Sequence, residues 1–76
     1  MVTVKYFASL RERLGRDGDT VSVGTPLTVA DLWHQVGAED IEPSRIMCAI
    51  NHDYANPSAI VNDGDEVAFF PPVTGG

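Results

Sequence analysis

A short segment near the C-terminus constrains the fold of this chain more than any other feature. Residues 66–70 (Glu-Val-Ala-Phe-Phe) have a period of two, with Val67 and Phe69 on one face. That period is typical of a β-strand packed on one side. A tight turn precedes it, in which Gly64 can take the positive φ that such turns require. The Pro-Pro pair at 71–72 ends it, because proline cannot donate a ladder hydrogen bond. We therefore predict a packed strand that leads into a stiff exit.

Length and charge restrict the class of protein and of partner. The 76 residues predict a single domain that buries roughly 60% of its unfolded surface, too little for a deep active-site cleft. Eleven acidic residues against five Lys and Arg give a formal charge of −6. This charge argues against nucleic acid and anionic membranes, because both reward basic residues, and favours a protein partner with a basic docking face. With one cysteine and no apolar N-terminal run, we expect a cytoplasmic protein without an internal disulfide, signal peptide or membrane span.

The N-terminal third of the chain predicts a strand, a short helix and a second strand. Residues 2–7 alternate between apolar and other residues and predict the first strand. Residues 8–14 change to helical spacing, and Gly15 is a candidate cap for that helix. Residues 20–23 alternate again, so we expect a second strand in a hairpin with the first.

The main helix is predicted to run from Thr28 to Gly37. The hydroxyl of Thr28 can accept a hydrogen bond from the amide of Asp31 at the N-terminus, and glycine is a common residue where helices end. An apolar stripe follows helical spacing and consists of Val29, Leu32, Trp33 and Val36. A tryptophan can serve as a ligand platform, but in so small a domain we expect this one in the core.

Shorter apolar segments complete the domain. Residues 47–50 (Met-Cys-Ala-Ile) predict a buried central strand, which ends at a polar turn at 51–53. Residues 54–55 predict a brief edge strand, and we expect Ile60 and Val61 to fill the core. The predicted core draws on both helices and on most of the strands: Val2, Val4, Tyr6, Leu10, Leu14, Val21, Val23, Leu32, Val36, Ile50, Val67 and Phe69.

No arrangement of catalytic or ligand-binding residues is visible. Cys48 lies in an apolar segment without a basic neighbour, so we predict a core residue. His34 and His52 lack the spacing of metal ligands, and the glycines match neither the GxxxxGK[ST] nor the GxGxxG phosphate-binding pattern. We therefore expect no metal site and no cofactor bound directly. ATP would have to be bound by a partner.

Four motifs together resemble one family. The run at 69–76 (Phe-Phe-Pro-Pro-Val-Thr-Gly-Gly) follows 63–67 (Asp-Gly-Asp-Glu-Val), while the N-terminal part contains Phe-Ala at 7–8 and Arg-Glu at 11–12. This combination resembles the small subunits of molybdopterin synthase, which are sulfur carriers of the ubiquitin-like β-grasp family. The resemblance is weakest at 37–58.

The resemblance implies an α+β fold of the ubiquitin-like β-grasp type. A mixed β-sheet would wrap over one main helix, with the first and last strands side by side in its centre. The chain would divide into a β-grasp domain at 1–70 and an extended tail at 71–76, ending in a flexible Gly-Gly pair.

The resemblance also implies the chemistry of the C-terminus. An adenylating enzyme related to ubiquitin-activating enzymes would activate Gly76 with ATP, and a sulfurtransferase would convert it to a thiocarboxylate. The tail would then enter the large subunit of molybdopterin synthase, a heterotetramer of two small and two large subunits. There the sulfur would pass to cyclic pyranopterin monophosphate to form the dithiolene of molybdopterin. Catalytic side chains would belong to the large subunit.

The partner-binding residues are predicted from the faces of the two terminal strands. Phe7 and Phe70 each follow an inward-facing aromatic residue, so both should point outward and form one exposed patch if their strands are neighbours. Arg11, one turn beyond Phe7, is a candidate ionic contact at the rim. The resemblance places the remaining contacts along the tail, at Pro71, Pro72, Val73, Thr74 and Gly75, with Gly76 as the reacting residue.

Three other functions are compatible with the sequence. The chain could carry sulfur for thiamine synthesis or tRNA thiolation, although the Phe-Pro-Pro-Val-Thr run at 70–74 fits the molybdopterin branch better. It could instead be a protein modifier joined through Gly76 to lysines, as ubiquitin is. The third alternative is a plain interaction module whose Gly-Gly end is only frayed, in which case losing Gly76 would be harmless.

Overall fold

The computed structural model describes residues 1–36 and 45–71. Seven strands and two helices lie in these ranges. They are β1 (Val2–Tyr6), α1 (Ser9–Leu14), β2 (Gly18–Val21), β3 (Leu27–Thr28), α2 (Val29–Gln35), β4 (Met47–Ile50), β5 (Asp53–Ala55), β6 (Ile60–Val61) and β7 (Glu66–Phe70).

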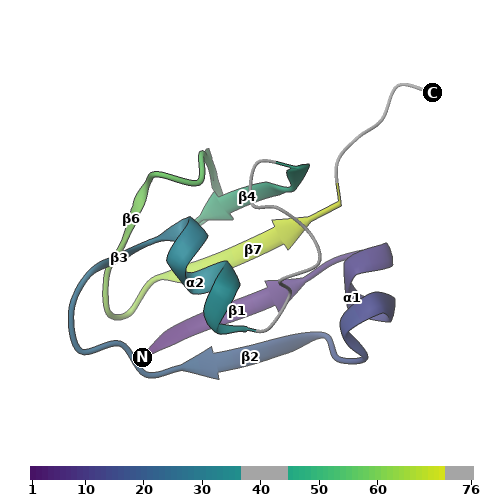
Figure 1. The fold of residues 1–76 in the computed structure, drawn as a ribbon, viewed down its shortest axis with the longest axis horizontal. Coiled ribbons are helices and arrows are strands. Elements are labelled where there is room, and N and C mark those ends of the chain that lie inside the picture. Colours follow the sequence, from purple (N-terminus) through teal and green to yellow (C-terminus); the bar gives the residue numbers. More distant parts are fainter. Residues whose placement is uncertain (37–44, 72–76) are drawn as a thin grey trace.

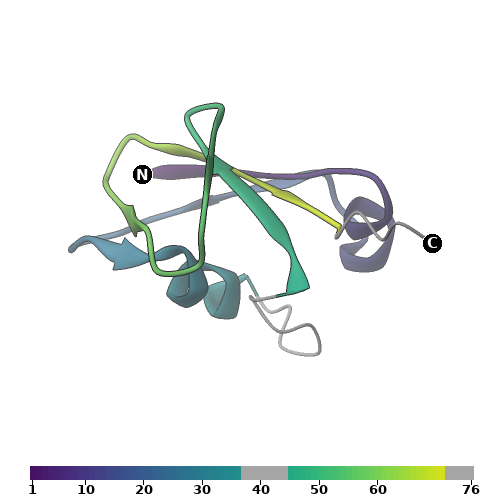
Figure 2. The ribbon, with the colours of Figure 1, turned by 90° about the horizontal axis from the view of Figure 1, so that it is seen from above.

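The main sheet is mixed and has the order β2-β1-β7-β4-β5. The first and last strands, β1 and β7, lie side by side in its centre and run parallel, and every other pairing is antiparallel. Helix α2 lies across one face of this sheet, and the opposite face carries no helix of the described segments (Figures 1 and 2). This arrangement confirms the predicted α+β fold.

The core fills the space between the sheet and α2. Trp33 and Phe69 pack with ring centroids 4.7 Å apart, and both are fully buried. The inward faces of the central strands supply Val2, Val4, Tyr6 and Val67 to this core, and α2 supplies Val29 and Leu32. The predictions that Trp33 and Cys48 are core residues are therefore confirmed, with Cys48 only 2% exposed. Four predicted core residues are only partly buried and pack around this cluster: Leu14, Val21, Val23 and Ile50.

The end of the short helix and the start of the main helix have identifiable caps. The hydroxyl of Thr28 accepts a hydrogen bond from the amide of Asp31 at 3.1 Å, as predicted. Gly15 takes a left-handed conformation at the end of α1, also as predicted. Helix α2 ends at Gln35, with Val36 as its C-cap. Gly37, the predicted end, lies outside the described residues.

Several boundaries differ from the predictions, and β5, for example, begins at Asp53 rather than at 54. Strand β2 covers Gly18–Val21 rather than 20–23, because the backbone of Gly18 lies so close to β1 that a β-carbon there would be 2.7 Å from the carbonyl oxygen of Val4. A glycine that reads as a loop residue is thus required inside the strand. Strand β1 ends at Tyr6, and α1 begins at Ser9, because Ala8 adopts a φ of 53° between them.

A second, two-stranded sheet formed by β3 and β6 was not predicted. Its strands are two residues long, too short for a readable period. Val61 is fully buried, whereas Ile60 is 53% exposed, so the prediction that both fill the core is wrong for Ile60. Successive residues of a strand point to opposite faces, so only one of the two can enter the core.

Candidate functional site

An aromatic cluster lies where β1 and β7 end. The rings of Phe7 and Phe70 stack with centroids 5.0 Å apart and an angle of 11° between their planes. Phe7 is 41% exposed and Phe70 is partly exposed. The predicted pair of neighbouring, outward-facing phenylalanines is therefore present, because parallel pairing of β1 with β7 brings their ends together.

Tyr54 extends this cluster and was not predicted. Its ring lies 6.4 Å from that of Phe70, and its side chain is 77% exposed. Pairing of β5 with β4 sets Tyr54 beside Ala49 on the outer face of the main sheet, which is the face opposite α2. Strand β5 has only three residues, and its position in the sheet depends on distant pairings that the sequence does not reveal. We call Phe7, Phe70 and Tyr54 the aromatic patch.

A tight turn at Ala8 fixes the position of Phe7. The amide of Phe7 donates to the carbonyl of Phe69 at 3.1 Å, and the carbonyl of Phe7 accepts from Leu10 at 3.1 Å. Between these bonds Ala8 holds φ 53° and ψ −129°, a conformation that favours glycine. Phe7 is therefore held on both sides by backbone hydrogen bonds while its ring remains at the surface.

Arg11 lies on the exposed side of α1, next to the aromatic patch. It lines a surface hollow together with Phe7 and Lys5. The predicted rim residue is thus placed near Phe7. Lys5 adds a second positive charge on the same face of β1.

A row of polar side chains crosses the outer face of the main sheet, away from the aromatic patch. The carboxylate of Glu66 on β7 lies 3.4 Å from the ammonium of Lys5 on β1 and 3.0 Å from Nε2 of His52 in the β4–β5 turn. Asn51 fixes this turn to β7. Its backbone amide donates to the backbone carbonyl of Glu66 at 2.8 Å, and its side-chain oxygen accepts from the backbone amide of Glu66 at 3.0 Å. The row was not predicted, since it joins three segments that are distant in sequence.

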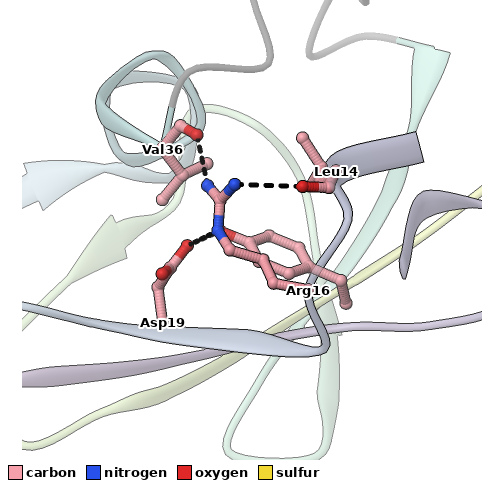
Figure 3. Close-up of polar contacts among 5 residues, drawn as sticks. Leu14, Arg16, Asp19 and Val36 are labelled. Carbon is pink, nitrogen blue, oxygen red and sulfur yellow. Dashed lines mark hydrogen bonds and ion pairs between the residues drawn. The ribbon is translucent and has the colours of Figure 1, made fainter. Parts of the chain in front are cut away.

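A second unpredicted cluster is centred on Arg16 and includes Tyr6 of β1. Its guanidinium donates to Asp19 at 2.6 Å, to the carbonyl of Leu14 at 3.2 Å and to the carbonyl of Val36 at 2.8 Å (Figure 3). It also lies 5.5 Å from the ring centre of Tyr6, whose hydroxyl donates to Asp19 at 2.7 Å. Arg16 thus joins the end of α2, the end of α1 and the strand that precedes Phe7.

The charges of this cluster are mutually stabilised. Burial by itself would raise the pKa of Asp19, but the hydrogen bonds from Arg16 and Tyr6 outweigh it and lower that pKa below its usual value. Burial raises the pKa of Tyr6 above its usual range, and the hydrogen bond to Asp19 acts in the same direction. The cluster therefore holds a neutral phenol between a carboxylate and a guanidinium.

The predicted tail is only partly described. Pro71 follows β7 and is partly exposed. Pro72, Val73, Thr74, Gly75 and Gly76 lie outside the described residues, so their predicted roles remain predictions.

Other chemically distinctive residues have structural surroundings. The thiol of Cys48 donates to the carbonyl of Ala55 at 3.2 Å, and burial raises its pKa, so the reactive thiolate is disfavoured. Within 1–36 and 45–71, no group of three or more His, Cys, Asp or Glu side chains is arranged to hold a metal ion. In the same ranges, neither helix has the length and apolar character needed to cross a membrane.

Comparison with known proteins identifies relatives along the whole chain. The model of the ThiS family matches residues 4–76. The molybdopterin synthase sulfur carrier subunit of Escherichia coli is 37% identical, and the alignment covers 100% of both chains. A putative molybdopterin converting factor subunit 1 from Pyrococcus furiosus has a similar structure, with a TM-score of 0.75, 30% identity and coverage of 95% of this chain and 97% of that one.

Two further structures extend the comparison. The protein SAMP1 from Haloferax volcanii has a TM-score of 0.74 and 30% identity, covering 99% of this chain and 98% of that one. A complex of subunits 1 and 2 of molybdopterin-converting factor from Helicobacter pylori contains a chain with the same fold, with a TM-score of 0.59, 20% identity and coverage of 99% and 97%. With a family model matched from residue 4 to residue 76, this chain belongs to the ThiS family, and its relatives include molybdopterin synthase sulfur carrier subunits.

Proposed function

We propose that this protein is the sulfur carrier subunit of a molybdopterin synthase. The observation that carries the proposal is the similarity to the E. coli sulfur carrier subunit, whose alignment covers the whole of both chains and therefore extends to residues 75–76 of this chain, the Gly-Gly pair. The aromatic patch supports it, because an exposed aromatic cluster at the exit of β7 is suited to docking a partner beside the tail.

The reacting group in this proposal is the carboxylate of Gly76. A terminal carboxyl group has a pKa of about 3.3–3.7, so at neutral pH it is an anion and a poor electrophile. A partner enzyme would join it to AMP with release of pyrophosphate from ATP. A persulfide on a sulfurtransferase would then attack the acyl carbon and displace AMP, and a thiol would cleave the resulting acyl disulfide, releasing the thiocarboxylate and forming a disulfide with the sulfurtransferase. Glycine suits this position because no β-carbon hinders passage of the backbone through a narrow channel.

The sulfur acceptor would be cyclic pyranopterin monophosphate, bound by the large subunit of the synthase. A dithiolene contains two sulfur atoms and each carrier brings one, so two loaded carriers would act in succession. A heterotetramer of two small and two large subunits would meet this requirement. The reaction would take place in the cytoplasm, where ATP is available to the adenylating partner.

Docking on the large subunit would use the aromatic patch, with Arg11 at its rim. From the end of β7 the six residues at 71–76 can extend by at most about 20 Å, since a stretched chain covers about 3.3–3.6 Å per residue. The two prolines would limit the conformational entropy that the tail loses on entering a partner. Val73, Thr74 and Gly75 would then lie along the channel of the partner.

Two variants test the proposal by separating transfer from docking. Deletion of Gly76 is expected to abolish dithiolene formation in an assay with the large subunit, the adenylating enzyme, ATP and a sulfur source. Its affinity for the large subunit, measured by calorimetry, should remain near that of the wild type. The matched variant Phe70→Ala should fold and be loaded, but should bind the large subunit more weakly by about 2 kcal/mol or more. Wild-type turnover by the Gly76 deletion would refute the carrier role.

One alternative has its own support. The chain is similar to two Haloferax volcanii structures, one named SAMP1 and the other small archaeal modifier protein 1. This similarity favours a protein modifier as the second candidate. Intact-mass measurement of protein from its native host separates the two functions. A species heavier by the difference between sulfur and oxygen supports the carrier, whereas lysine-linked adducts without that species support the modifier.

A further inference from the structure

The outer face of the main sheet contains a hollow between two different walls. Its floor is formed by Ala68 on β7 and Ala49 on β4, which are direct partners across the two strands. The same lateral row continues to Lys5 on one side and to Tyr54 on the other. Two neighbouring alanines between long side chains leave a depression that larger residues would fill.

The two walls of the hollow differ in chemistry. Residues two positions before and after Ala68 point to the same face of β7. Phe70 therefore stands on one side, joined by Phe7, and Glu66 stands on the other, joined by His52. The hollow has a volume of about 290 Å³, at the lower limit of the roughly 300–1,000 Å³ typical of small-molecule pockets, which is room enough for one long side chain.

The carboxylate of Glu66 has capacity for a further donor. Its contact with Lys5 is long, at 3.4 Å, and its contact with His52 involves a side chain that is 88% exposed. A carboxylate has about four acceptor sites, of which these two contacts use only part. The side chain of Glu66 is itself 32% exposed, so a partner can reach it.

We propose that this hollow receives an arginine side chain from the protein that docks on the aromatic patch; the proposal rests on the docking role given under the proposed function. The planar guanidinium stacks on aromatic rings and donates two parallel hydrogen bonds to a carboxylate. The hollow offers both features on facing walls. A cationic anchor also matches a chain whose formal charge is −6.

Other occupants fit the walls less well. An apolar side chain would cover the carboxylate of Glu66 without offering it a donor, and burying a charge without a new partner is costly. A partner carboxylate would approach Lys5 but would meet repulsion from Glu66. A lysine would supply the charge, but its ammonium is a compact point charge and cannot form the planar stack.

Two matched substitutions test the sign of the occupant's charge. Glu66→Gln and Lys5→Gln each replace a charged end by a neutral amide at opposite sides of the hollow. Binding of the large subunit is measured by calorimetry for both. With an arginine in the hollow, Glu66→Gln should weaken binding about tenfold or more, whereas Lys5→Gln, which removes a competitor for Glu66, should leave binding equal or tighter. Phe70→Ala in parallel reports on the docking role itself.

The possible results separate the alternatives. Weaker binding of Lys5→Gln alone would indicate an acidic occupant, weaker binding of both variants would indicate that the ion pair itself is needed, and unchanged binding of both would indicate an apolar occupant. Each of these results would contradict the proposal that an arginine enters the hollow, provided that Phe70→Ala weakens binding. If Phe70→Ala also binds like the wild type, the docking role has failed instead.

A further variant, Ala68→Leu, fills the hollow without changing its charges. It should weaken binding about tenfold or more while the thermal unfolding midpoint stays near that of the wild type, because the new side chain projects outward from the sheet. Wild-type affinity of this variant would mean that no side chain enters the hollow.

Discussion

At the scale of single residues, position in the chain explains the aromatic patch only in part. Phe7 and Phe70 could be predicted as outward-facing because each follows a buried aromatic residue in an alternating strand. Tyr54 could not, because its neighbours across the sheet are set by the pairing of β4 with β5. Arg16 could not either. Leu14 and Asp19 are near it in sequence but in a segment without regular spacing, and the carbonyl of Val36 at the end of α2 is 20 residues away.

The cluster around Arg16 leads to a prediction about acid stability. The pKa of Asp19 is lowered in the folded protein, because hydrogen bonds from Arg16 and Tyr6 outweigh the effect of burial. A lowered carboxyl pKa stabilises the fold at pH values above the unfolded value near 3.8, and this stabilisation is lost as pH falls through the folded value. In urea titrations followed by Trp33 fluorescence between neutral and acid pH, the free energy of unfolding should fall less steeply below about pH 4 in Asp19→Asn than in the wild type.

Arg16→Gln provides the control for this measurement. It removes a donor to the carboxylate of Asp19 while keeping that carboxylate, so the acid dependence should also become shallower. Identical pH dependence in wild type and Asp19→Asn would show that the cluster does not stabilise the fold through the ionised carboxylate.

At the scale of elements, the long apolar patterns were predictable and the short ones were not. The alternation in β1 and β7 and the stripe on α2 each extend over several residues, so they identify the buried faces. Strand β2 was displaced in the prediction because Gly18 is needed for close approach to β1, which only the paired structure reveals. Strands β3 and β6 have two residues each, too few to show a period.

A substitution in helix α2 tests the orientation of this helix through the stability of the fold. Leu32 is fully buried against the sheet. Leu32→Ala should lower the free energy of unfolding by roughly 2–5 kcal/mol, a large share of the roughly 5–15 kcal/mol typical of a small domain. His34→Ala changes an exposed residue of the same helix and should have little effect. Denaturant unfolding of both variants measures the difference, and equal stability would contradict the orientation of the helix.

At the scale of the whole molecule, the parallel pairing of β1 with β7 is the feature that assembles the proposed docking site. It brings residues near both ends of the chain together, so that Phe7 meets Phe70 beside Pro71. Periodicity predicts the strands but not which of them are neighbours. The central position of these two strands was predicted only from the family resemblance, and the sheet order confirms it.

Under the proposed function, docking and sulfur transfer depend on different parts of the chain. A carrier that docks but cannot transfer sulfur should therefore inhibit the synthase. A variant without Gly76 retains the aromatic patch but has lost the residue proposed to carry the sulfur, so it should occupy the large subunit without delivering sulfur. Added in excess to loaded wild-type carrier, it should therefore slow dithiolene formation, and more wild-type carrier should restore the rate. The same deletion combined with Phe70→Ala should inhibit far less, because the double variant has lost a docking contact as well. If both deletion variants inhibit equally, the tail rather than the aromatic patch holds the carrier on its partner. If neither inhibits at large excess, Gly76 itself supplies most of the affinity.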